Sequence, residues 1–101
     1  MNDPRIDKLA RVLVRYSVDV QEGDLVVISG APTATPLVTA AFREVLLAGG
    51  NPWVRMAPDA CGELFFRHAN EQQLRFLNPL DKQIIEKADV TMGFWAGENT
   101  K

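Results

Sequence analysis

The first stretch that could do chemistry is Val26 to Pro36, VVISGAPTATP, where a buried apolar run meets a helix start. Backbone amides at such a junction can hold a phosphate. A dinucleotide site needs three glycines spaced GxGxxG, and a P-loop needs GxxxxGK followed by Ser or Thr. This stretch has one glycine, Gly30, and its prolines Pro32 and Pro36 have no amide hydrogen. We therefore interpret it as a structural connection between a strand and a helix.

The second candidate is a metal site around His68, the only histidine of the chain. Glu71 follows it by three residues, which would bring both side chains to one face of a continuous helix. Asn70 is a typical helix N-cap, however, and predicts that a new helix starts between them. A catalytic zinc ion needs three protein ligands. We assign no metal ligand, cofactor or catalytic residue to this chain.

The third candidate is Cys61, the only cysteine. A reactive thiol needs an electropositive environment, whereas Asp59 and Glu63 lie close to Cys61 in the sequence and disfavour a thiolate. We expect an inert thiol. A single cysteine also excludes an internal disulfide and favours a cytoplasmic setting.

Composition excludes several classes of partner. The chain has 101 residues, of which 47% are hydrophobic and 24% charged, as expected for one globular domain. Eleven Lys and Arg against thirteen Asp and Glu give a net charge of -2, so no positive field attracts nucleic acid. No apolar run approaches the length of about 18 residues that a membrane helix needs.

Three apolar or alternating runs predict strands near residues 25–29, 52–57 and 90–95. Helical patterns precede, separate and follow the first two strands, at 4–16, 36–48, 61–69, 70–77 and 80–87. Strands separated by helices predict a parallel sheet. The fold class is therefore α/β, with three layers, helices on both faces, and the form of a Rossmann-like or flavodoxin-like half. The long connection after the second strand favours the strand order 2-1-3, with 3-2-1 as the alternative.

Local signals add detail to the helices. Asp3 should cap a helix that has proline at its first position, and Asn70 with Gln73 resembles a capping box. Thr33 or Thr35 should cap the helix that Pro36 begins. The first helix should bury one stripe and leave Asp7 to form a surface pair with Arg11, and Arg43 and Glu44 of the next helix should face water. The buried stripe would comprise Ile6, Leu9, Leu13 and Tyr16, widened by Ala10 and Val14.

Ligands of open parallel sheets bind beyond the carboxyl ends of the strands. At that edge we expect a cavity-facing group made of Ser29, Gly30, Thr33, Asp59, Glu98 and Asn99. Three strands make a small sheet, and the third lies close to the last residue of the chain. We therefore expect an uncovered sheet edge and apolar surface near Trp95, and a chain that forms part of something longer.

These segments, taken in order, resemble the N-terminal part of the thermophilic-type metallo-aminopeptidases, the family of aminopeptidase T and aminopeptidase S. The similarity extends over essentially all 101 residues. Its strongest pieces are LARVLVRYSVDVQEGDLVVI at 9–28, PLVTAAFREVLLAGGNPWVR at 36–55 and ADVTMGFWAGENTK at 88–101. The resemblance implies that residues 1–101 are a single N-terminal α/β domain of a longer aminopeptidase.

The resemblance further implies an exopeptidase that removes N-terminal residues from peptides with two divalent metal ions, zinc, cobalt or magnesium. The ligands of those ions would lie in a C-terminal catalytic domain, and the whole protein would be a homodimer with an internal cavity. The N-terminal domain would contribute structure and limit substrate access, and would be inactive alone. Two alternatives are a nucleotide- or small-ligand-binding flavodoxin-like domain and a free-standing interaction module.

Overall fold

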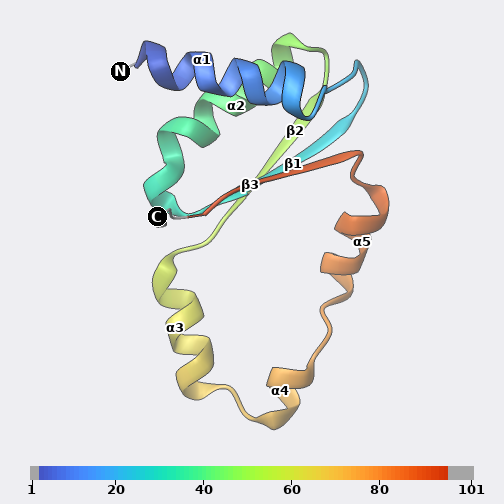
Figure 1. The fold of residues 1–101 in the computed structure, drawn as a ribbon. Helices are drawn as coiled ribbons and strands as arrows, with labels where there is room; N and C mark the ends of the chain where they lie inside the picture. Colours follow the sequence, from blue (N-terminus) through green and yellow to red (C-terminus); the bar gives the residue numbers. More distant parts are fainter. Residues whose placement is uncertain (1–2, 96–101) are drawn as a thin grey trace.

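A computed structural model describes residues 3–95, which form an α/β fold (Figure 1). Residues Glu98 and Asn99 lie outside the described part. The elements, in chain order, are helix α1 (Pro4–Val12), π-helix η1 (Leu13–Ser17), strand β1 (Leu25–Gly30), 3-10 helix η2 (Pro32–Ala34), helix α2 (Thr35–Leu47), strand β2 (Asn51–Met56), helices α3 (Asp59–His68), α4 (Glu71–Arg75) and α5 (Pro79–Lys87), and strand β3 (Val90–Phe94).

The three strands form one parallel sheet in the order β2-β1-β3. Val27 at the centre of β1 lies opposite Trp53 on one side and Thr91 on the other. The predicted fold class and the favoured order 2-1-3 are confirmed, and each strand boundary is within one residue of its prediction. The order follows from the long connection between β2 and β3, which passes over β1 and delivers the chain to the opposite edge.

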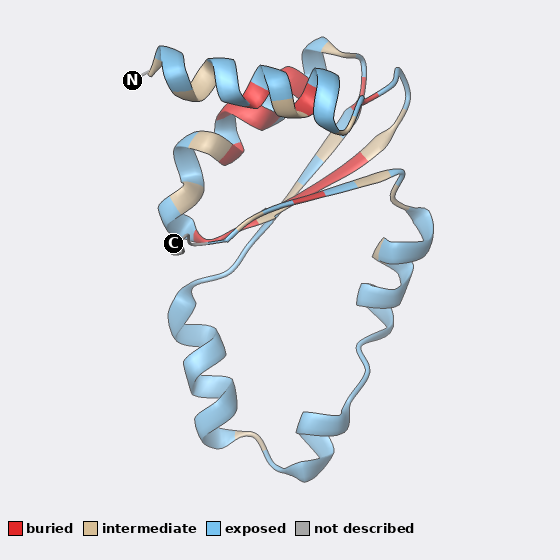
Figure 2. Ribbon diagram, viewed as in Figure 1, coloured by how far each residue is buried: buried red, intermediate tan, exposed pale blue. Residues whose placement is uncertain are grey.

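The core lies on one face of the sheet, under α1 and α2 (Figure 2). Alternation along β1 points Val26 and Ile28 to this face, where Met92 of β3 joins them. The two helices supply small or β-branched side chains, which allow their backbones to approach closely. The buried residues of these helices that belong to the core are Ala10, Val14, Val38, Ala40, Ala41 and Val45.

The first helix differs from its prediction at its C-terminal half. Ala10 and Val14 are buried, but Leu9 is half exposed and Tyr16 is 77% exposed. The exposure of Tyr16 follows from the change to π winding at Leu13, which alters the direction of the side chains after it. The turn ends at Asp19, a non-glycine residue with a φ of 49°, after which Val20 re-enters the core.

The connection from β2 to β3, residues 57–89, is here called the crossover arm. It extends away from the sheet and carries α3, α4 and α5 (Figure 1). Apart from Ala69, every residue from 55 to 83 is exposed, and the arm is almost uniformly pale blue in Figure 2. Only α5 reaches the second face of the sheet, where Arg55 Nη2 lies 3.2 Å from Asp81 Oδ1. This second face is therefore only partly covered: Val27 at its centre is buried, whereas Trp53, Arg55 and Thr91 are exposed.

Local signals position the helices of the arm. Asn70 accepts a hydrogen bond from the Gln73 amide (2.8 Å), and the Gln73 side chain accepts one from the Asn70 amide (2.9 Å), which confirms the predicted capping box. Asn78 caps α5 through the Leu80 amide. The predicted helix ends differ from the structure by up to two residues. Helix α3 begins at Asp59 and not at residue 61, and α4 ends at Arg75 and not at residue 77.

Candidate functional site

The carboxyl edge of the sheet holds the described residues of the expected cavity-facing group. Ser29 and Gly30 end β1, Thr33 lies in η2 directly after it, and Asp59 opens α3 after β2. Because the strands are parallel, the ends of β1 and β2 meet at the same edge. The four residues do not converge on one point, however, because strand alternation sends Ser29 and Gly30 to opposite faces.

A hollow of 460 Å³ opens at this edge on the α1 and α2 side. Thr33 is the one expected residue that lines it. The other lining residues were not predicted as part of the site. Ile6 was expected only in the buried stripe of the first helix, and Gly93 has no side chain that would indicate a binding role. Ile6, Ala34, Pro36, Leu37, Gly93, Phe94 and Trp95 complete the lining.

Gly30 is buried and has a packing reason for being glycine. A Cβ atom at this position would lie 2.8 Å from the Phe94 carbonyl oxygen and 3.2 Å from Val38 Cγ2. The close approach lets the Ala31 amide donate a hydrogen bond to the Phe94 carbonyl oxygen (3.1 Å). Gly30 thus joins β1 to β3 tightly just below the hollow.

Ser29 and Asp59 lie on the other side of the edge. Ser29 is half buried on the second face, in register with Arg55 of β2 and Gly93 of β3. Asp59 is exposed at the first position of α3, where a carboxylate interacts favourably with the helix dipole. Its position is explained by the helix terminus, and no ionisable side chain is shown to pair with it within the described residues.

The junction after β1 offers few amides to a phosphate. The amides of Ala31 and Ala34 donate to the carbonyl oxygens of Phe94 and Ala31, and the Thr35 amide donates to Pro32. Since proline has no amide hydrogen, Thr33 supplies the one remaining amide of residues 31–36. The interpretation of this stretch as a structural connection agrees with this geometry, which disfavours the nucleotide-binding alternative.

The expected threonine cap of α2 is wrong. The N-cap residue is Ala34, and it makes no side-chain hydrogen bond. The Thr35 hydroxyl instead donates to the Pro32 carbonyl oxygen. The cause is the 3-10 turn η2, which carries the chain into α2 and places Thr35 inside the helix.

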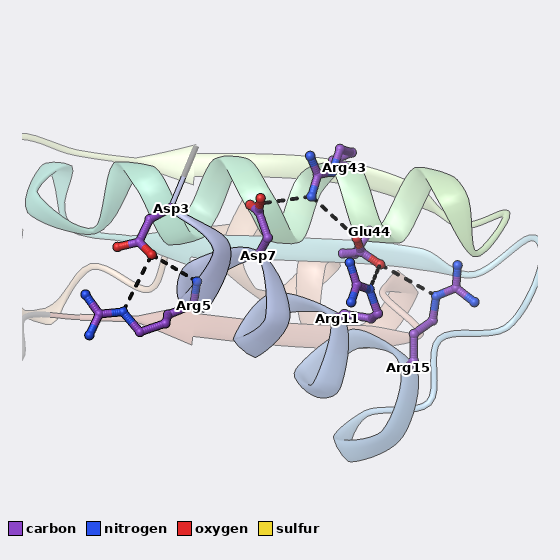
Figure 3. Close-up of polar contacts among 7 residues, drawn as sticks. All are labelled: Asp3, Arg5, Asp7, Arg11, Arg15, Arg43 and Glu44. Carbon is purple, nitrogen blue, oxygen red and sulfur yellow. Dashed lines mark hydrogen bonds and ion pairs between the residues drawn. The ribbon is translucent and has the colours of Figure 1, made fainter. Parts of the chain in front are cut away.

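A second polar cluster joins α1 and η1 to α2, around the carboxylate of Glu44 (Figure 3). Glu44 is 2% exposed. Its Oε1 atom lies 3.9 Å from the Nε atoms of both Arg11 and Arg15, and its Oε2 atom lies 3.7 Å from Arg43 Nη2. Arg43 Nη2 also lies 3.4 Å from Asp7 Oδ1.

This cluster corrects two expectations. Glu44 does not face water, because α1 lies across α2 and covers it, and Asp7 pairs with Arg43 instead of with Arg11. A buried carboxylate requires compensating positive charge. The arginines provide that charge from the half-exposed rim of the contact. We interpret the cluster as a clamp that fixes the first helix on the second.

The arm contains a further hollow, of 640 Å³, between α3 and α4. Cys61 and His68 both line it, together with Leu64, Phe65 and Phe76. The two polar side chains are seven positions apart in the same helix, which corresponds to about 10 Å along the helix axis. A thiol and an imidazole at that separation cannot share a proton directly, so the pair is not a nucleophilic dyad.

Within residues 3–95, no three His, Cys, Asp or Glu side chains gather closely enough to hold a metal ion. The described residues therefore do not fit a metal centre. The same part of the chain contains no helix long and apolar enough to cross a membrane.

The family of the chain follows from comparison with family models. The model of the thermophilic metalloproteases (M29) matches residues 2–101. The chain belongs to the M29 metalloprotease family. A comparison with curated proteins finds no match. Membership of M29 assigns the chain to the hydrolases and implies that the enzyme uses divalent metal ions, as the resemblance to aminopeptidases T and S predicts. The carboxyl edge is therefore the candidate functional site of this M29 chain. Its described residues form a surface and gather no set of metal ligands.

Proposed function

We propose that this chain is the N-terminal structural and substrate-access domain of a metal-dependent aminopeptidase. One observation carries the proposal: a metalloprotease family model matches residues 2–101, although residues 3–95 gather no set of metal ligands. A domain of a metallopeptidase without its own metal centre contributes through shape and position. The metal ions and the water that they activate then belong to residues elsewhere in the enzyme.

The carboxyl edge supports a role in access. The hollow beside Thr33 is lined mainly by apolar side chains, including Phe94 and Trp95, with no ionisable side chain among them. Such a lining can exclude bulky substrates and water without taking part in proton transfer. The packed junction at Gly30 holds this wall rigidly to the sheet.

The remaining parts of the proposal follow from the family resemblance. The substrates would be peptides cleaved at their N-terminal residue, with two zinc, cobalt or magnesium ions in a C-terminal catalytic domain. The whole enzyme would be a cytoplasmic homodimer, and Glu98 and Asn99 would lie near the catalytic domain.

The test compares this chain with the product of its complete reading frame. Both are assayed for release of nitroaniline from amino acid nitroanilides, with cobalt, zinc or magnesium added. The proposal expects metal-dependent turnover by the complete protein and none by residues 1–101. Turnover by the 101-residue chain would contradict the proposed division of roles. A complete protein that cleaves internal peptide bonds but no nitroanilide would contradict the exopeptidase assignment.

A further inference from the structure

We propose that the crossover arm and the partly covered second face of the sheet form a docking surface for the metal-binding part of the same enzyme. The proposal rests on the proposed function, because it assumes that the metal ligands lie outside residues 3–95. It adds the surface through which the two parts meet. Its support comes from the exposed side chains, the helix lengths, the surface area and the charges of the arm.

Large apolar side chains of the arm face solvent in this structure. Phe66 is 80% exposed and Leu77 is 88% exposed, and Leu74, Phe76 and Ile85 are also more than half exposed. Trp53 on the second face of the sheet is 49% exposed, and Trp95, directly after β3, is 62% exposed. Single exposed apolar residues are ordinary, but large apolar side chains exposed on each of α3, α4 and α5 indicate an interaction surface.

The arm helices are too short to persist without packing. Helices α3, α4 and α5 have 10, 5 and 9 residues, whereas isolated helices below about 12–15 residues are marginal in water. Their caps select where each helix begins, but a capping interaction contributes only about 1 kcal/mol. Stable helices therefore require a surface that covers their apolar sides.

The exposed area has the size of a permanent interface. The chain exposes 7261 Å², whereas a compact protein of its mass exposes about 5,700 Å². The excess of about 1,500 Å² on one partner exceeds the ~800 Å² of a standard complex and falls within the range of obligate interfaces. The radius of gyration agrees, since it is 15.3 Å in the structure, whereas about 13 Å is expected for a compact chain of this length.

The charges of the arm select an apolar partner. Arg67 lies 4.0 Å from Glu63, and Arg75 lies 3.4 Å from Glu71, so these charges balance within their own helices. The hollow between α3 and α4 is mainly apolar. A nucleic acid or a strongly acidic peptide would find no net positive field here. A folded protein surface with apolar side chains fits.

Continuity with the carboxyl edge selects the metal-binding part over other proteins. Trp95 is exposed and also lines the hollow that contains Thr33, and α3 begins beyond the carboxyl end of β2. A body seated between the arm and the sheet would therefore border the edge at which parallel sheets place ligands. A metallopeptidase needs its metal centre near the wall that limits substrate access, and this surface puts the two side by side.

Photo-crosslinking in the complete protein tests the docking surface. Phe66 and Phe76 are replaced singly by p-benzoylphenylalanine, and Tyr16, an equally exposed aromatic residue on η1, is replaced as the matched control. The replacements conserve an aromatic ring and lie on the surface, so folding should persist. After irradiation, the crosslinked peptides are identified by mass spectrometry.

The proposal expects several-fold more crosslinking from positions 66 and 76 than from 16, into peptides outside residues 1–101 of the same polypeptide. Crosslinks chiefly to residues 3–95 of a second copy would overturn it in favour of self-association. Equal yields at all three positions would also overturn it. The nitroanilide assay of the unsubstituted complete protein tests the proposed function separately, and absence of metal-dependent turnover would refute that function. The crosslink pattern tests only the docking surface.

Discussion

Replacing Gly30 by alanine tests whether the junction between β1 and β3 is as tightly packed as the structure indicates. The added Cβ atom would lie 2.8 Å from the Phe94 carbonyl oxygen, a distance that real Cβ contacts essentially never show. Neither side can yield easily, because that oxygen accepts the hydrogen bond from Ala31 and Val38 closes the other side at 3.2 Å. Overpacking costs about 1–3 kcal/mol. Since backbone atoms form the obstacle, we expect a loss in the upper half of that range, about 2–3 kcal/mol.

Urea unfolding of the 101-residue chain, followed by the fluorescence of Trp53 and Trp95, measures this loss. With a slope of about 1–2 kcal/mol per molar for a chain of this size, the midpoint should fall by about 1–3 M. Gly62→Ala is the matched control, because no atom lies within 4 Å of its added Cβ, and it should cause no loss. A Gly30→Ala midpoint equal to that of the parent chain would refute the reasoning about the close approach.

Two further substitutions probe the first helix and its contact with the second. Glu44→Gln removes the charge that Arg11, Arg15 and Arg43 surround, and should lower the free energy of unfolding by about 1–3 kcal/mol. The control Glu86→Gln, on the exposed side of α5, should change that free energy by less than about 0.5 kcal/mol. Equal effects of the two substitutions in urea titrations would contradict the interpretation that Glu44 fixes α1 on α2. Asp19→Gly relieves a φ of 49° and should raise the midpoint, with a gain of up to about 1 kcal/mol; a lower midpoint would mean that the aspartate side chain stabilises the turn.

The sequence was sufficient for the elements because their signals are local. Alternating or continuous apolar runs located all three strands, and Asp3, Asn70 and Gln73 act as caps as predicted. Gly49 ends the second helix with a φ of 87°, a conformation that glycine adopts without strain. The favoured strand order, 2-1-3, was inferred from the length of the connection between β2 and β3.

The same reasoning failed where tertiary contacts decide. Nothing in the residues around Glu44 shows that another helix covers it, because two of its three arginine partners, Arg11 and Arg15, belong to a distant part of the sequence. The π winding at Leu13 likewise moved Tyr16 away from the core. At the carboxyl edge the sequence identified Ser29, Gly30 and Thr33 as neighbours but could not separate the two faces on which they act.

The contrast between the two faces of the sheet is consistent with the proposed role. On one face, α1, α2 and the strands form their own core. The close approach at Gly30 joins β1 to β3, and the ion pairs of Glu44 join the first helix to α2. On the other face, helices with well-formed caps carry their apolar side chains into solvent. These helices are well specified by local sequence signals, yet residues 3–95 provide no core against which their apolar sides pack. Local and tertiary signals agree only when the surface that covers these helices lies outside the described residues. In the proposed function, the packed face would act as the wall that limits substrate access, and the arm would bind the metal-binding part without contributing a metal ligand.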